Sequence, residues 1–128
     1  MWQPFPLFLI LTEGECWAIM AGLALMALDV LAGLMSAVLT GTFASTKMRE
    51  GLGHKAMLIL VIALAVAIQG FSGHVAELGW SVPLIVPVCA YIVVMEVSSI
   101  LENVAKAYPG LADTALFRLF DRGDDEQK

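Results

Sequence analysis

The chain has 128 residues, which is one domain's length and too short for two large ones. Its apolar fraction is 59% and its charged fraction only 15%, against about 25% charged residues in an ordinary soluble domain. There is too little polar surface to cover a soluble core, and the chain is too apolar to remain disordered. The net charge of −5 argues against nucleic acid as a partner. The composition therefore predicts a small all-α integral membrane protein whose first partner is the lipid bilayer.

Three apolar stretches set the predicted membrane spans. The hydrocarbon core of a bilayer is crossed by a helix of about 20 apolar residues. Residues 16–41 contain one charge, at Asp29, and residues 82–101 contain one, at Glu96. A shorter stretch, 56–71, contains none. We expect a single domain, 1–128, with three transmembrane helices at about 16–41, 55–72 and 82–103, followed by a tail at 104–128.

The amino-terminal stretch from Phe5 to Leu11 is apolar but only seven residues long. It is too short to span a bilayer, and no basic residue precedes it, so it does not resemble a secretory signal. We expect it to lie in the membrane interface, anchored by aromatic side chains such as Trp2. A fourth, partial span is the alternative.

The basic residues predict the orientation. Three lie in the expected first loop, and the other four follow the third helix, whereas the amino-terminal segment and the second loop have none. Basic residues in short loops stay in the cytoplasm. We therefore expect an amino terminus outside and a carboxyl terminus inside, in a bacterial cytoplasmic membrane. The first-loop residues expected to contact anionic headgroups at the membrane surface are Lys47, Arg49 and Lys55.

The first predicted helix carries small residues at helical spacing on and beside the face of Asp29. Small side chains allow close approach of another helix, and helix association in lipid depends on packing. Contact within one subunit and self-association between subunits both explain the pattern, and the sequence leaves them open. The candidate packing residues are Gly22, Asp29, Gly33, Ala37 and Gly41.

Several polar side chains fall within the predicted spans. Asp29 is about 13 residues from either end of its segment, hence roughly 20 Å from each interface. Insertion of an ionised carboxylate at that depth costs a few kcal/mol unless the carboxylate has a partner. We therefore expect Asp29 to have a functional role. The alternative is that its carboxyl group only joins two helices. On the third helix the i, i+4 order of Glu102 and Lys106 favours an ion pair. The candidates for an intramembrane polar or pore-lining role are Asp29, Gln69, Glu96, Ser99 and Asn103.

Two local features complete the chain. Pro87 follows Pro83 at the start of the third span and is expected to kink the helix. The segment after Pro109 alternates apolar and polar residues and is expected to form a short amphipathic surface helix capped by Asp113, with a solvated end.

No catalytic or metal-binding motif occurs in the sequence. There is no CxxC, HExxH, Walker or GxSxG pattern. Cys16 and Cys89 lie in apolar stretches and are interpreted as small buried hydrophobic residues. His54 and His74 fall on opposite sides of the membrane in the predicted topology. We expect no enzyme activity, no catalytic residues, no metal and no cofactor.

Taken in order, several pieces of the chain between about 14 and 109 resemble the phage holin family that is also called the toxin secretion/phage lysis holins. Trp17 precedes a run that ends in Leu28-Asp29-Val30-Leu31-Ala32-Gly33, and Ser45 precedes Gly51-Leu52 and His54-Lys55. Gln69 stands where the family often has an Asp. The most specific block lies in the third span, and the motif residues are Gly51, Lys55, Glu96, Ser99, Ile100, Glu102 and Asn103.

The resemblance implies a pore- or lesion-forming protein of phage lysis or toxin secretion. Such a protein assembles into homo-oligomers in the cytoplasmic membrane and lets an endolysin or another exported protein reach the cell wall, leading to cytolysis. A small ion or proton channel, or a transporter subunit that uses the buried carboxylates, is the alternative from another functional class. An accessory membrane protein that only binds a partner is a third.

Overall fold

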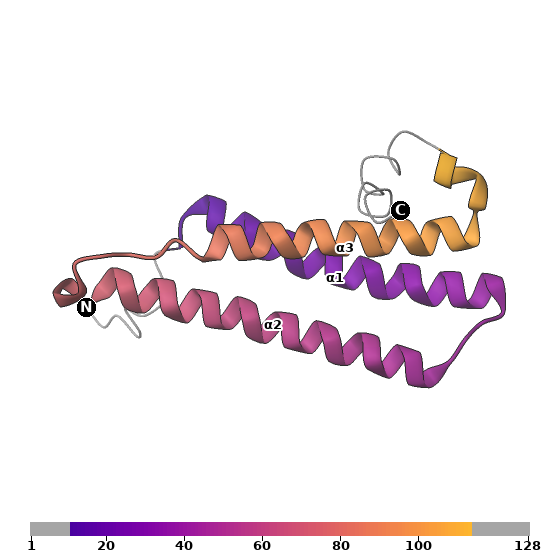
Figure 1. The fold of residues 1–128 in the computed structure, drawn as a ribbon, viewed down its shortest axis with the longest axis horizontal. Coiled ribbons are helices and arrows are strands. Elements are labelled where there is room, and N and C mark those ends of the chain that lie inside the picture. The colour runs from indigo at the N-terminus through magenta and orange to yellow at the C-terminus, as the bar shows by residue number, and fades with distance from the viewer. Residues whose placement is uncertain (1–10, 114–128) are drawn as a thin grey trace, which may run out of the picture.

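A computed structural model describes residues 11–113. Three long helices make up the described part of the chain: α1 (Glu13–Thr40), α2 (Ser45–His74) and α3 (Ile85–Ala107). All three are long and apolar enough to cross a membrane. The short 3₁₀ helices η1 (Ala76–Leu78) and η2 (Pro109–Asp113) follow α2 and α3. The helices lie lengthwise together, with α1 against α3 and α2 along the pair (Figure 1). The prediction of an all-helical protein with three membrane-spanning helices is confirmed.

Capping residues set both ends of α1. Thr12 and Glu15 form a capping box, in which the Thr12 side chain accepts from the Glu15 backbone N–H and the Glu15 carboxylate accepts from the Thr12 backbone N–H. This cap starts α1 three residues before the expected position. The helix ends at Gly41, whose φ of 67° is left-handed and suits a residue without Cβ.

The largest departure from the expected elements is at the start of α2. We expected the second helix to begin at about residue 55, but it begins at Ser45, ten residues earlier. Gly51 and Gly53 each weaken a helix by about 1 kcal/mol relative to Ala, but the segment contains no proline to interrupt it. Lys55 therefore lies inside a helix rather than at its edge.

The position of Pro87 in the structure removes the reason for the kink that we expected there. Helix α3 begins at Ile85, three residues later than expected, so Pro87 lies in its first turn. Backbone N–H groups in the first turn have no intrahelical acceptor, so a proline there removes no helix hydrogen bond. Helix α3 continues to Ala107, four residues beyond the expected end.

Each helix turns one face inward, and the inward residues recur at alternating intervals of three and four. This spacing is typical of helices packed nearly side by side. The buried apolar core between them consists of Met26, Ile62, Ile85, Cys89 and Ile92. The inward positions of α2 show the spacing most clearly, at Lys55, Leu58, Ile62, Ala65, Gln69 and Ser72.

The outward faces are strongly apolar. Large exposed side chains such as Leu31, Leu64 and Tyr91 occur on all three helices, as is expected of a surface in contact with lipid.

Cys89 is buried as expected, whereas Cys16 is exposed on α1, contrary to its interpretation as a buried residue. The predicted interfacial segment before Leu11 and the predicted tail helix after Asp113 lie outside the described residues.

Candidate functional site

Three ionisable side chains, one from each helix, meet inside the bundle. The Lys55 ammonium donates to Asp29 Oδ2 at 2.7 Å and to Glu96 Oε2 at 2.6 Å. The Lys55 side chain is 12% exposed, and those of Asp29 and Glu96 are 9% and 3% exposed. Lys55, from α2, thus bridges a carboxylate of α1 and a carboxylate of α3. We call these three residues the charged cluster.

The cluster lies at one level of the bundle. Asp29 is 11 residues before the end of α1, Glu96 is 11 before the end of α3, and Lys55 is 10 after the start of α2. At 1.5 Å per residue, each lies about 15–17 Å from the same end of the bundle. An unpaired buried charge is expensive in an apolar medium, so the direct ammonium–carboxylate contacts explain how two carboxylates are accommodated there.

Asn103 extends the cluster toward the end of α3. Its side-chain amide donates to Asp29 Oδ1 at 3.2 Å, so both carboxylate oxygens of Asp29 are hydrogen-bonded. A Cβ at Gly33 would lie 3.6 Å from this amide nitrogen. This is an ordinary van der Waals distance, so Asn103 packs against α1 at Gly33. Ser99, on the same side of α3, lines the neighbouring cavity.

A second polar contact joins the helices near their other end. The Gln69 amide donates to Glu15 Oε1 at 2.7 Å, and its carbonyl oxygen accepts from the Ile85 backbone N–H at 2.9 Å. Ser72, one turn along, accepts from the Val82 backbone N–H at 3.0 Å. Gln69 is thus separated from the charged cluster by the apolar core, and the structure does not bring all five polar candidates together.

The small-residue stripe of α1 is used within the chain. Gly22 is buried, and a Cβ there would lie 3.9 Å from both Ile62 and Ile92. Ala37 is half-buried and lines the cavity beside the cluster. Gly41 is exposed and serves as the helix cap. The structure thus gives Gly22, like Gly33, a role in packing inside one copy.

The expected membrane-surface position of Lys55 is not the one observed. Lys47 and Arg49 are exposed near the start of α2, whereas the Lys55 ammonium lies between two buried carboxylates. A lysine at the edge of an apolar stretch resembles an interfacial residue, so the sequence did not reveal that Lys55 pairs with buried carboxylates. The spacing of Lys55, Leu58 and Ile62 could have predicted it, because this spacing places the lysine on the inward face of α2.

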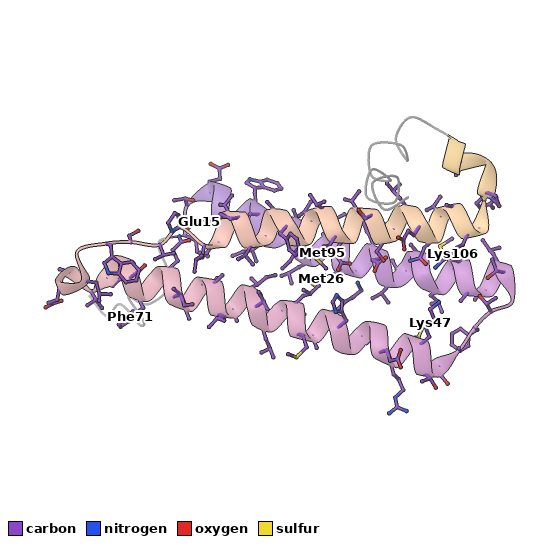
Figure 2. All side chains as sticks on the ribbon, in the orientation of Figure 1. Glu15, Met26, Lys47, Phe71, Met95 and Lys106 are labelled. Carbon is purple, nitrogen blue, oxygen red and sulfur yellow. The ribbon has the colours of Figure 1, made fainter. Side chains whose placement is uncertain are left out.

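A cavity of about 280 Å³ opens between the helices beside the charged cluster. It is lined by the last turns of α1 and α3 and the first turns of α2, including Lys47, Gly51, Glu102 and Lys106. Figure 2 shows Lys47 and Lys106 at one end of the bundle and Glu15 toward the other. Glu102 and Lys106, expected to pair, form no ion pair in the structure.

Within residues 11–113 there is no group of three or more His, Cys, Asp or Glu side chains that could hold a metal ion. In the same range, no buried side-chain nitrogen or oxygen lacks a hydrogen-bond partner. The polar groups of the described interior are therefore satisfied by one another.

Comparison with known proteins identifies one family. The family model of the bacteriophage holin family matches residues 8–109, which include all three helices and the charged cluster. No curated protein and no solved structure matches the chain.

Proposed function

The chain belongs to the bacteriophage holin family, and from this membership we propose that it assembles with copies of itself into lesions in the cytoplasmic membrane. The lesions dissipate the membrane potential and let an endolysin, or another exported protein, reach the cell wall. The holin family is not a family of enzymes, and the three apolar helices are those of a multi-pass inner membrane protein. The match over residues 8–109 is the observation that carries the proposal.

The arrangement of polar groups supports this proposal. In a single copy the charged side chains Asp29, Lys55 and Glu96 are paired with one another inside the bundle, and the outward faces are apolar. Such a bundle can accumulate in lipid without exposing charge to it. The same polar residues provide a wettable surface when neighbouring copies rearrange around a lumen.

The orientation that we propose has the amino terminus outside and the carboxyl terminus in the cytoplasm. Lys47, Arg49 and Lys106 belong to the turns of α2 and α3 at one end of the bundle. Basic residues of short loops remain on the cytoplasmic side. Glu15 and Gln69 are then nearer the outer side.

Induced expression in a bacterium tests the lesion. The protein is produced with and without a cytoplasmic endolysin that lacks its own export signal, while membrane potential and optical density are followed together. We expect abrupt depolarisation in both cultures and lysis only where endolysin is present. An empty vector carrying the endolysin alone is the control, and a culture that keeps its potential contradicts the proposal.

A small ion or proton channel is the second candidate function. The direct contacts of Asp29 and Glu96 with Lys55 favour it, because ionisable groups joined between helices are typical of ion and proton pathways. In the same experiment, depolarisation with retention of the endolysin indicates this function instead of a protein-sized lesion.

A further inference from the structure

The cavity beside the charged cluster has the features of a binding site. Its volume is about 280 Å³, just below the roughly 300–1,000 Å³ usual for ligand pockets. It extends from the loop residues Thr42 and Phe43 to Asp29 and Lys55. The cavity thus runs inward from one end of the bundle along the start of α2.

The open end of the cavity carries two cations. Lys47 is the third residue of α2 and Lys106 the last but one of α3, and both line the cavity. Neither forms an ion pair with any side chain of residues 11–113. Glu102 is the one carboxylate among the described lining residues outside the charged cluster. Two ammonium groups against one carboxylate leave a positive entrance suited to a phosphate group.

The walls between this entrance and the charged cluster are largely apolar on the side of α1 and α2. Val30 and Leu34 come from α1, and Leu52 comes from α2. Gly51 also lines the cavity, and a Cβ added to it would meet no atom within 4 Å. The cavity therefore suits a molecule that joins a phosphate to an apolar part.

We propose that this cavity binds the headgroup end of a phospholipid, whose phosphate lies between Lys47 and Lys106 and whose first acyl carbons contact the apolar wall. The entrance lies within a turn of the ends of α2 and α3. When these helices span a bilayer, their ends are close to the lipid phosphates. The volume fits this end of the lipid and leaves the rest of the acyl chains in the surrounding lipid. This inference depends on membrane insertion and not on lesion formation.

Binding is measured on the purified full chain in detergent. The probe is dioctanoyl phosphatidylglycerol, a short-chain phospholipid, and the signal is the rise in thermal unfolding temperature, since a ligand that binds the folded state stabilises it. Dioctanoylglycerol has the same chains without phosphate, and inorganic phosphate has the anion without chains. We expect the phospholipid to stabilise the protein and neither comparison compound to do so at the same concentration.

Two matched pairs of variants locate the site. Replacing both cations, Lys47→Gln with Lys106→Gln, is expected to weaken binding by about tenfold or more, because two charge-assisted contacts are lost. Arg49→Gln removes an exposed neighbouring charge but leaves both cavity lysines in place, so it is expected to weaken binding less than the double lysine variant does.

The second pair uses two glycines of α2. Gly51→Leu fills the cavity, whereas Gly53→Leu changes a glycine that does not line it. Both changes raise helix propensity, so neither is expected to unfold α2. We expect Gly51→Leu to abolish the stabilisation by phospholipid and Gly53→Leu to preserve it.

Four results would overturn the proposal: no stabilisation of the parent protein, equal stabilisation by dioctanoylglycerol or by inorganic phosphate, equal weakening by Arg49→Gln and the double lysine variant, or full binding by Gly51→Leu. The glycine pair decides the question if the double lysine variant does not fold. Since lysis is not measured, failure here and failure of the proposed function are distinguishable.

Discussion

At the scale of single residues, Lys55 joins three helices with one ammonium group. It contacts Asp29 at 2.7 Å and Glu96 at 2.6 Å, and all three side chains are largely buried. Desolvation of buried charges opposes folding, and their mutual attraction offsets it only when the contacts are complete. The charges are therefore tolerated as a set, and loss of the lysine alone is worse than loss of all three charges.

Removal of the lysine alone is the first prediction. Lys55→Met leaves Asp29 and Glu96 buried without their cation, and the expected loss is about 3–5 kcal/mol of unfolding free energy. Denaturant titration of the purified protein in detergent, followed by circular dichroism, measures the change. Arg49→Gln, an exposed cation on the same helix, is the control and is expected to be close to the parent.

The triple variant Asp29→Asn, Lys55→Met, Glu96→Gln separates charge pairing from side-chain packing. Replacement of a whole buried ionic set is often neutral or stabilising, so this variant is expected to be more stable than Lys55→Met alone. If Lys55→Met is as stable as Arg49→Gln, the charged cluster does not hold the helices together.

At the scale of the elements, the small residues of α1 determine how closely the other helices approach. The Cβ that Gly22 lacks would lie 3.9 Å from Ile62 on α2 and from Ile92 on α3, so both neighbours leave space for a methyl group but little more. Gly33 has the corresponding role beside Asn103. In lipid, where apolar expulsion does not drive association, such close packing is a principal source of stability.

Two substitutions at Gly22 test this packing. Gly22→Ala adds a methyl group at ordinary contact distance and raises helix propensity, so it is expected to be neutral or stabilising by up to about 1 kcal/mol. Gly22→Leu forces three more carbons against Ile62 and Ile92 and is expected to cost about 1–3 kcal/mol. Thermal unfolding temperatures measure both. Gly53→Leu is the control on an open face, and equal stability of the two leucine variants would contradict the packing role of Gly22.

At the scale of the whole molecule, the ends of the bundle differ in charge. Lys47, Arg49 and Lys106 lie in the turns at one end, and Glu15 lies in the first turn of α1 at the other. The membrane potential and the lipid headgroups act on this asymmetry and favour one orientation.

Cys16 is exposed near the outer end of the proposed topology, while Cys89 is fully buried and shielded from reagents.

The proposed orientation predicts the pattern of cysteine labelling. A membrane-impermeant maleimide added to intact spheroplasts is expected to modify Cys16 and not Cys89. In a Cys16→Ser background, Ser45→Cys places an exposed thiol at the opposite end of the bundle and is expected to react only after the membrane is permeabilised. Mass spectrometry of the labelled protein identifies the site. Labelling of Ser45→Cys in intact spheroplasts and protection of Cys16 would indicate the reverse orientation.

The amino-acid sequence alone was enough to predict the number of membrane-spanning helices and to identify the polar residues inside them. Runs of apolar residues and the cost of a buried carboxylate depend on chemical composition along the chain, so Asp29 and Glu96 could be singled out without coordinates. The bacteriophage holin family could likewise be identified from the order of the motifs.

Which of these groups meet could be seen only in the folded bundle. Helical periodicity shows that Lys55 shares a face with Ile62, but not which helix that face contacts or how far α2 extends before it. The contacts of that face and the extent of α2 depend on the relative registers of the three helices. The registers are determined by the helix caps, by the close approach at Gly22 and by the pairing of the charges themselves. For the same reason, the cavity with Lys47 and Lys106 at its entrance could not be predicted, because it is formed by segments far apart in the chain.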